Sequence, residues 1–269
     1  RFFIFDGADG FAVALCGACG RCVDAAGLDI IAVAGVEGKM KSIFILTGAG
    51  ISAESGIKTF RAADGLWEDH RVQDVATPEA FIANPDLVHR FYNARRAQLK
   101  TVEPNAAHQA LARLQRDYKQ GTVTIVTQNV DDLHERAGAD VIHMHGELRK
   151  LRCTHCRTAF EWTEDAHKEM SCPHCERSGD LRPDIVWFGE IPYHMETIRQ
   201  ALTQSAIFVA IGTSGAVYPA AGFVQEAIFN GIETLEINLE KTQSSSLFHR
   251  SSFGKATQSV SDWVQAVLE

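Results

Sequence analysis

The chain has 269 residues, of which 45% are hydrophobic and 22% are charged, the balance of an ordinary globular protein. Its 34 acidic and 26 basic residues give a formal net charge of −8, which disfavours stable binding to nucleic acid or to an anionic membrane surface. No apolar run approaches the roughly 18 residues of a membrane helix, and seven cysteines are too few, and odd in number, for an extracellular disulfide scaffold.

Residues 1–39 differ in composition from the rest of the chain. They are rich in Gly, Ala and Asp, and their broken apolar stretches and early acidic residues do not fit a signal peptide. Cys16, Cys19 and Cys22 have the spacing of metal ligands, but the segment supplies no fourth ligand. The first methionine is Met40. We therefore interpret residues 1–39 as a leader, disordered or non-native, that precedes a domain over residues 40–269.

From Lys41 onward, short apolar strands alternate with helical stretches. Buried strands are expected over residues 42–46, Val123–Thr127, Ile207–Ile211 and 234–238, and helices over Pro85–Leu99, 106–118, 198–204 and 220–229. This alternation predicts an α/β fold with a doubly wound parallel, Rossmann-like sheet. The serines at 244–246 and the residues after them are interpreted as a surface loop.

The first strand ends in a glycine turn, Gly48-Ala49-Gly50, which Ser52 and Ala53 follow closely. Glycines at such a turn let the backbone approach a pyrophosphate, and the start of the next helix offers unpaired N–H donors. The third glycine of the dinucleotide-binding fingerprint is replaced by Ala53. The turn alone is therefore a weak indication of a cofactor, and a purely structural strand-to-helix turn is the alternative.

Polar side chains follow the next strand. Gln128, Asn129 and Asp131 come after Val123–Thr127 and are expected at the sheet edge where parallel strands end and ligands bind. These groups suit hydrogen bonding to ribose hydroxyls and a carboxamide, although a loop with capping residues is the alternative. A further apolar stretch ends in His143-Met144-His145-Gly146. Either histidine suits a general base near neutral pH, and their spacing predicts that both point to one face of a strand.

Four cysteines interrupt the alternation of strands and helices. Two Cys-x2-Cys pairs with fifteen residues between them have the spacing of a tetrahedral zinc site, and its ligands would be Cys153, Cys156, Cys172 and Cys175. Four protein ligands close the coordination sphere, so this zinc ion should be structural. We expect a zinc-binding insertion over about residues 149–182, in which His155 and His174 are bystanders.

In this order, the motifs resemble the sirtuin family, most closely the bacterial CobB-type protein lysine deacylases. The resemblance covers residues 42 to about 267. It includes the stretch 48–56, Thr59-Phe60-Arg61, 127–129, 143–146, the four cysteines, 186–190, 212–214 and 238–240. It implies that the predicted domain is a sirtuin catalytic domain, with a zinc ribbon and a helical part beside the sheet. It also implies that NAD is consumed as a co-substrate.

The resemblance further implies site residues. In sirtuins the acyl oxygen of a modified lysine attacks the ribose carbon that carries nicotinamide, and the products are nicotinamide, deacylated lysine and O-acyl-ADP-ribose. The implied base is His145, with Asn129 and Asp131 as further catalytic residues. The implied NAD contacts are Gly48, Ala49, Gly50, Ser52, Ala53, Phe60, Arg61, Trp67, Gln128, Asn129, Asp131, Gly212, Thr213, Ser214, Asn238, Leu239, Glu240 and Ala256. The stretch Val186, Trp187, Phe188, Gly189 and Glu190 resembles the edge that pairs with the substrate peptide.

One pair of side chains bears on the acyl group. Tyr92 and Arg95 lie three residues apart on a predicted helix, so they share a face, and an arginine can bind a carboxylate bidentately. Within the family, this pair, together with Thr59 and Ala62-Ala63, resembles the class that removes succinyl and malonyl groups as well as acetyl groups. The alternative is a solvated helix face, because Arg96 is adjacent.

We expect acylated-lysine proteins or peptides as partners, a cytoplasmic location, and neither membrane nor stable nucleic-acid binding. The sequence does not indicate an oligomeric state. Two other functions stay open. A protein ADP-ribosyltransferase would share the release of nicotinamide, and a non-catalytic zinc-ribbon binding module would use a basic face formed by Arg149, Lys150, Arg152 and Arg157. NAD-dependent deacylation of an acyl-lysine peptide would distinguish the predicted deacylase from both alternatives.

Overall fold

The computed structural model describes residues 41–58, 66–67, 70–215 and 217–269, with residues 66 and 67 described through their backbone alone. The predicted leader with its three cysteines, and the expected cofactor contacts Phe60 and Arg61, lie outside the described residues. Of Trp67, only its place in the short strand β2 (Leu66–Trp67) is described; this strand pairs with β3 (His70–Arg71).

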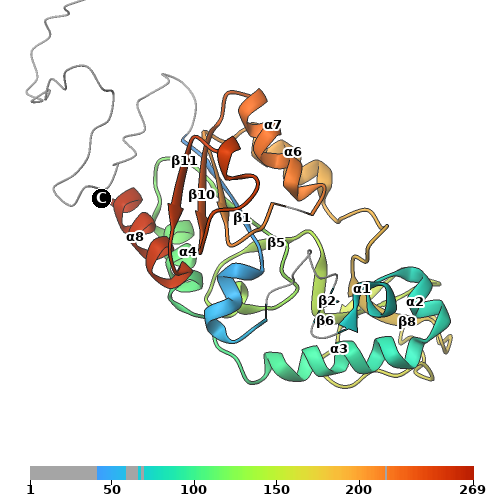
Figure 1. Ribbon diagram of the computed structural model, residues 1–269. Helices are drawn as coiled ribbons and strands as arrows, with labels where there is room; N and C mark the ends of the chain where they lie inside the picture. Colours follow the sequence, from blue (N-terminus) through green and yellow to red (C-terminus); the bar gives the residue numbers. More distant parts are fainter. Residues whose placement is uncertain (1–40, 59–65, 68–69, 216) are drawn as a thin grey trace, which may run out of the picture. The chain divides into compact units, whose positions relative to one another are not determined.

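The principal element is a parallel sheet with the strand order β11-β10-β9-β1-β4-β5 (Figure 1). Its strands are β1 (Ile43–Thr47), β4 (Val123–Thr127), β5 (Val141–His143), β9 (Ile207–Ile211), β10 (Glu233–Asn238) and β11 (Arg250–Phe253). The central strands β1 and β9 are apolar nearly throughout because both faces of the sheet are covered. This confirms the predicted doubly wound α/β fold. The interpretation of the residues after 246 as loop was wrong, since β11 pairs with β10 as an edge strand whose polar, exposed residues gave no apolar signal.

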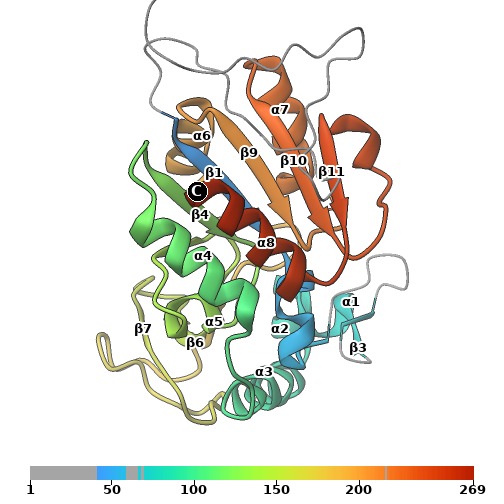
Figure 2. The same cartoon turned by 90° about the vertical axis from the view of Figure 1, so that its left-hand side faces the viewer.

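Helices cover both faces of this sheet. On one side lie α4 (Ala106–Asp117) and α8 (Ala256–Leu268), which Figure 2 shows side by side. On the other side, α6 (Met195–Thr203) and α7 (Phe223–Phe229) pack on a core cluster that includes Phe44 and Phe208. The helix predicted over 220–229 begins as the 3-10 turn η2 (Ala220–Gly222) before α7 starts.

A smaller antiparallel sheet has the order β7-β6-β8, with β6 (Gly146–Cys153), β7 (Ala159–Glu161) and β8 (Leu181–Ile185). Three helices lie close to it in space: α1 (Val72–Val75), α2 (Pro78–Ala83) and α3 (Pro85–Leu99). Arg96 of α3 is buried and donates to the main-chain oxygens of Leu148 and Glu164, at 2.9 and 3.1 Å. This face of α3 is therefore packed against the cysteine-bearing segment, not solvated.

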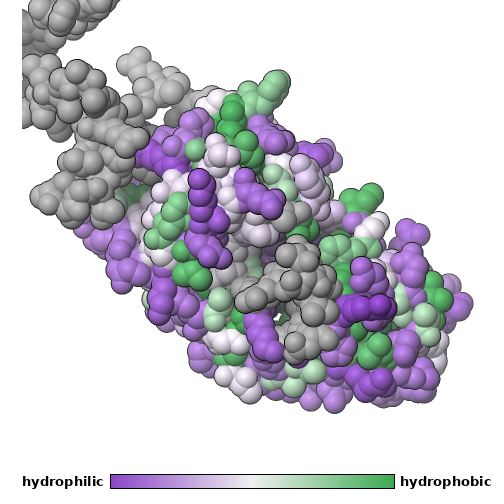
Figure 3. All heavy atoms as spheres, viewed as in Figure 1, coloured by the Kyte–Doolittle hydropathy of each residue, from purple (hydrophilic) through white to green (hydrophobic). Residues whose placement is uncertain are grey.

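The surface is mixed in character. Figure 3 shows polar and charged side chains over the face seen in Figure 1, with apolar residues scattered among them. Among the described helices, none combines the length and the apolar character needed to cross a membrane.

Candidate active site and zinc site

Three central strands of the parallel sheet end in register. Thr47 of β1 pairs with Thr127 of β4 on one side and with Ile211 of β9 on the other. The strand order reverses at β1, and ligands of doubly wound sheets bind beyond the strand ends at such a reversal. Gly48, Gln128 and Gly212 directly follow these three strands, so the structure brings the three predicted segments together.

The glycine turn is required by the contact between two loops. A Cβ atom at Gly50 would lie 2.7 Å from the Cα of Gly212, and one at Gly48 would lie 2.9 Å from the oxygen of Gly212. The N–H of Gly50 donates to that same oxygen at 2.8 Å, and Gly212 has a φ of +60°. The turn leads into a 3-10 helix, η1 (Ala49–Ser55), where the sequence predicted an ordinary helix. Close backbone packing thus accounts for these glycines even before a cofactor is considered.

Ser52 is the centre of a buried hydrogen-bond network. Its hydroxyl donates to Asp131 Oδ2 at 3.0 Å and accepts from Asn129 Nδ2 at 3.2 Å. His108 Nε2 lies 3.3 Å from the same hydroxyl oxygen. Because the N–H of Asn105 donates to His108 Nδ1, the Nε2 atom carries the ring proton and donates to Ser52. The network holds both predicted polar residues, Asn129 and Asp131, in fixed orientations.

Burial shifts the pKa values of the two titratable groups in this network in opposite directions. Burial raises the pKa of Asp131 to about 6, against hydrogen bonds from the Leu133 N–H and Ser52 that lower it. Burial lowers the pKa of His108 to about 4, so this ring is neutral at neutral pH. His108 was missed by sequence reasoning, although its place three residues after the helix cap Asn105 is the signature of a capping box.

The two histidines of the 143–146 motif do not share one face of a strand, contrary to the prediction. β5 ends at His143, the chain turns at Met144, and β6 begins at Gly146. His145 Nδ1 lies 3.0 Å from the main-chain oxygen of Gln128. A carbonyl oxygen only accepts, so Nδ1 carries the proton and Nε2 presents a lone pair. Burial lowers the pKa of His145, which keeps the ring neutral and able to accept a proton.

His143 has the opposite character. Its Nδ1 lies 3.0 Å from the main-chain oxygen of Asn129, and its Nε2 lies 2.5 Å from Glu135 Oε1. Burial disfavours its charged form, but the hydrogen bond and charge of Glu135 outweigh burial and raise the pKa of His143. The Nε2 atom of His143 is thus engaged by Glu135 and is not available to accept a proton from a substrate. Of the two histidines that the sequence left open, His145 therefore has the form of a general base.

Glu135, His143 and Glu147 also have ligand atoms within 4.8 Å of one another. Glu135 already pairs with His143, and Glu147 forms an ion pair with Lys150 at 2.6 Å. These charges are compensated within the protein, and the cluster needs no metal ion to balance them.

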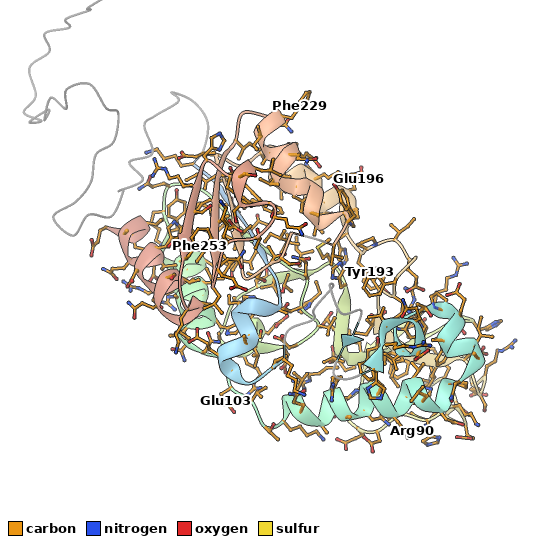
Figure 4. All side chains as sticks on the ribbon, viewed as in Figure 1. Arg90, Glu103, Tyr193, Glu196, Phe229 and Phe253 are labelled. Carbon is orange, nitrogen blue, oxygen red and sulfur yellow. The ribbon has the colours of Figure 1, made fainter. Side chains whose placement is uncertain are left out.

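The turn that carries His145 is supported from the small sheet. Tyr193, between the two sheets in Figure 4, donates its main-chain N–H to the oxygen of Met144 at 2.9 Å and its hydroxyl to Asp184 Oδ1 at 2.8 Å. A Cβ atom at Gly146 would collide with the main-chain oxygen of Asp184, and Gly146 has a φ of +82°. The glycine after the predicted base is therefore a packing requirement.

Further predicted cofactor residues gather at the ends of β4, β9 and β10. Gln128 Nε2 donates to Thr213 Oγ1 at 3.0 Å, and Asn238 Nδ2 donates to the main-chain oxygen of Thr213 at 2.8 Å. Asn238 also donates to Glu236, a buried acid inside an apolar strand that sequence reasoning missed. The remaining predicted positions are less enclosed: Ala53, Ser214, Leu239 and Glu240 are exposed, and Ala49 and Ala256 are half-buried.

The four cysteines converge in the small sheet. The Sγ atoms of Cys153 and Cys175 lie 3.7 Å apart, as do those of Cys156 and Cys172, and all four lie within 4.8 Å of one another. Tetrahedral thiolates at zinc–sulfur distances of 2.3 Å would be about 3.8 Å apart. Hydrogen bonds from Thr158 lower the pKa of Cys156 to about 6, which favours the thiolate that zinc binds. The donor set fits a structural zinc ion.

Both cysteine pairs share one backbone motif. The residue after each pair has a positive φ, 63° at Arg157 and 62° at Glu176. Their N–H groups donate back to the oxygens of Cys153 and Cys172, at 2.9 and 2.8 Å. Each turn thus directs two sulfur atoms toward one point.

The segment 186–190 runs beside His145. Val186 donates its N–H to the main-chain oxygen of His145 at 2.9 Å, and Phe188 donates to the oxygen of Ala76 at 3.0 Å. The Trp187 side chain turns inward and is only 2% exposed, and its main-chain N–H donates to Glu190 Oε2 at 2.8 Å.

Inside, Trp187 meets the predicted acyl-binding pair on α3. The Trp187 indole N–H donates to the Tyr92 hydroxyl at 2.9 Å, and Tyr92 is fully buried. The Arg95 guanidinium carbon lies 5.2 Å from the centre of the Phe91 ring, and this side chain is half-buried. The structure therefore brings Tyr92 against the segment 186–190, which runs beside the predicted base.

Comparisons with known proteins agree with this arrangement. The Sir2 family profile matches residues 48–219. An NAD-dependent protein deacylase of Escherichia coli K12 is 55% identical over 230 residues, which are 84% of this chain and 82% of that protein. An NAD-dependent protein deacylase of Leishmania major is 56% identical over 234 residues, 85% of this chain and 96% of that protein. A crystal structure of a Sir2 homologue in complex with NAD has a TM-score of 0.77 and 38% identity, and the match covers 85% of this chain and 91% of that one. The chain belongs to the Sir2 family.

Proposed function

We propose that this NAD-dependent protein deacylase removes succinyl and malonyl groups as well as acetyl groups from lysine side chains. The proposal includes transfer of the acyl group to ADP-ribose and a cytoplasmic location, where thiols stay reduced for zinc. Family membership and the relatives above support the enzyme over a non-catalytic zinc module. Three of the basic residues in that alternative also bind within the protein: Arg149 to Asp132, Lys150 to Glu147 and Arg152 to Tyr193.

The observation that carries the proposal is the hydrogen bond between Trp187 and Tyr92. It ties α3, which bears the Tyr-x-x-Arg pair, to the segment 186–190, which itself bonds to the main chain of His145. An acyl-lysine that paired with this segment would present its acyl group between the base and α3. A Sir2 protein structure with a p53 peptide and NAD+, 27% identical with a TM-score of 0.69, supports peptide binding in this fold.

The chemistry of α3 suits an acidic acyl group. A succinyl or malonyl chain ends in a carboxylate, which Arg95 can bind through two N–H groups while the Tyr92 hydroxyl donates a third hydrogen bond. Arg95 is half-buried beside the Phe91 ring, where charge interactions are stronger than in open water. An acetyl group lacks the carboxylate and would leave this clamp unused.

The polar residues at the strand ends have matching roles. NAD supplies the ADP-ribose that accepts the acyl group when its bond to nicotinamide breaks. His145 Nε2 takes a proton from a ribose hydroxyl, because its Nδ1–H is already engaged by Gln128. Asn129 and Asp131, held by Ser52, position the ribose and stabilise positive charge on it. The zinc ion supports the fold around these residues and takes no part in the chemistry.

The test compares kcat/KM on acetyl, succinyl and malonyl versions of one peptide in the presence of NAD. We expect all three to be deacylated. Arg95→Met should reduce desuccinylation at least about tenfold more than deacetylation, since it removes a charge-assisted bidentate contact. Arg90→Met is the matched control, because Arg90 is exposed on the same helix (Figure 4).

Equal losses on the acetyl and succinyl peptides in Arg95→Met would contradict the carboxylate clamp. ADP-ribose incorporation into protein without any peptide deacylation would instead support the ADP-ribosyltransferase alternative.

A further inference from the structure

A continuous set of contacts runs beneath the segment 186–190. It begins at Glu190, whose two carboxylate oxygens accept from Arg182 of β8 at 2.7 and 2.9 Å. The same guanidinium donates to the main-chain oxygen of Ile185 at 2.7 Å. Glu190 also accepts from the main-chain N–H of Trp187 at 2.8 Å. The ion pair of Arg182 and Glu190 therefore holds the chain between Ile185 and Glu190 in this turn.

Arg182 also fixes the Trp187 side chain. Its guanidinium carbon lies 3.4 Å from the centre of the indole ring, the distance of a stacked cation–π pair. Phe81 of α2 packs on the same indole with a centroid distance of 5.4 Å. With Trp187 and Tyr92 both buried, the indole has no room for another orientation, and its N–H is directed at the Tyr92 hydroxyl.

This hydrogen bond determines what the Tyr92 hydroxyl can do. An indole N–H only donates, so the Tyr92 oxygen must be the acceptor of this bond. The single proton of the hydroxyl then points away from Trp187. Burial raises the pKa of Tyr92, so that proton is retained at any ordinary pH. A carboxylate only accepts hydrogen bonds. A hydroxyl held in this way can therefore donate its proton to one.

We propose that Trp187 and Arg182 are positioning residues for the selection of acidic acyl groups. Trp187 orients the Tyr92 hydroxyl as a donor to the acyl carboxylate, and Arg182 holds the indole in place. The inference rests on the proposed desuccinylase function. Because Arg182 also binds Glu190, one cation with an 11% exposed side chain supports both the peptide-pairing segment and the acyl clamp.

The experiment uses the full chain and the acetyl and succinyl versions of one peptide. Trp187→Phe keeps an aromatic ring and removes the N–H donor. We expect the ratio of succinyl to acetyl kcat/KM to fall about fivefold, the usual effect of one neutral hydrogen bond, with the change mainly in KM for the succinyl peptide. In a Tyr92→Phe background, Trp187→Phe should produce no further change in that ratio, because the hydroxyl it orients is absent.

A second variant keeps the proposal testable if Trp187→Phe folds poorly. Arg182→Lys retains the charge but loses both the bidentate bond to Glu190 and the planar stack. It should raise KM for both peptides and lower the succinyl-to-acetyl ratio as well. Zinc content and the thermal midpoint report whether each variant is folded.

The outcomes separate this inference from the proposed function. An unchanged ratio in Trp187→Phe and Arg182→Lys, with a selective loss in Arg95→Met, overturns the positioning role alone. Equal losses on both peptides in Trp187→Phe assign the indole a purely structural role and also overturn it. A wild-type protein that does not remove succinyl groups overturns the proposed function and this inference with it.

Discussion

The Nδ1–H group of His145 donates a hydrogen bond to the main-chain oxygen of Gln128 across 3.0 Å. The bond makes Nε2 the basic nitrogen of the ring and lets the loop after β4 set its direction. His143, two residues earlier, bonds in the same manner to Asn129 but pairs its other nitrogen with Glu135. One loop thus orients both rings, and the partner of Nε2 distinguishes them: Glu135 favours the protonated form of His143, whereas burial favours the neutral form of His145 by lowering its pKa.

Replacing the base should abolish activity without unfolding the protein. His145→Tyr removes the lone pair proposed to accept the ribose proton, so NAD-dependent deacylation of both acetyl and succinyl peptides should fall to background. Zinc content and thermal midpoint should stay near those of the wild type, because the zinc ligands lie elsewhere on the small sheet. His155→Ala, an exposed histidine, is the control and should keep full activity. Residual activity in His145→Tyr would assign the base to another residue.

In acid, kcat/KM should decline only at a pH below the usual pKa range of histidine. Burial lowers the pKa of His145, so the ring stays deprotonated as the pH falls through roughly 6.5, the value of a free histidine. The kcat/KM should therefore hold down to that pH and decline only under more acidic conditions. A decline centred well above 6.5 would be inconsistent with a buried neutral base at this position.

The sequence predicted the central strands of the sheet but not the buried contacts between side chains. Continuous apolar runs such as Ile207–Ile211 predicted the central strands to within a residue, because a parallel strand covered on both sides is apolar on both faces. The edge strand β11 carries polar, exposed residues and had no such signal. The cysteine spacing predicted the metal site, since zinc geometry constrains spacing directly.

Contacts between distant residues could not be predicted in this way. The spacing of His143 and His145 is compatible with one strand, but the chain turns at Met144, whose main-chain oxygen accepts from Tyr193, 49 residues later in the sequence. Likewise, the spacing of Tyr92 and Arg95 places them on one face, but the buried partner of Tyr92 is Trp187. Such pairs are set by how the helices and strands pack, which local periodicity does not contain.

The buried carboxylate of Asp131 should make the protein less stable than it would be without it. The folded state raises the pKa of this group to about 6, so its contribution favours folding at low pH and is lost as the pH rises through 6. Asp131→Asn should therefore increase the free energy of unfolding by about 1 to 2 kcal/mol at pH 8 and show little gain at pH 5. Deacylation should fall sharply in the same variant.

The measurement for Asp131→Asn is urea unfolding at the two pH values. Asp132→Asn is the matched control, because Asp132 is the adjacent carboxylate and pairs with Arg149 at 2.8 Å. It should not stabilise the protein. A destabilised Asp131→Asn at pH 8 would mean that the hydrogen bond to Ser52 outweighs the cost of the buried charge.

Because of His108, the free energy of unfolding should decrease as the pH is lowered. Its pKa is lowered to about 4 by burial, so the unfolded chain binds a proton before the folded protein does, and stability is lost as the pH falls below about 6.5. Between pH 7.5 and 5 the loss should be about 2 kcal/mol. His108→Gln keeps a donor toward Ser52 without a titrating ring, and its drop over that range should be smaller by this amount.

His134, His143 and Asp131 also titrate in this region, with shifts of both signs. They are present in both the wild type and His108→Gln, so their own titration largely cancels in the difference between the two urea series. That difference reports His108 together with its coupling to His134, whose ring centre lies 4.9 Å away. His155→Gln, at an exposed site, should follow the wild type. Parallel series for wild type and His108→Gln would contradict the role of the buried ring.

Removing zinc should disable the enzyme through α3. The metal site closes the sheet β7-β6-β8, and α3 is fastened to that segment by Asn93, which bonds to Ala166, and by Arg96, which bonds to Glu164 and Leu148. Cys172→Ser, or chelation of the wild type, should lower the zinc content from one ion per chain and abolish deacylation of both peptides. Far-UV circular dichroism should keep most of its helical signal, because the parallel sheet and its helices have a core of their own.

His174→Ala, between two zinc ligands but not one itself, should keep both zinc and activity. A Cys172→Ser variant with full zinc content would contradict the four-thiolate site, and a zinc-free protein with full activity would show that α3 does not depend on the metal for its position.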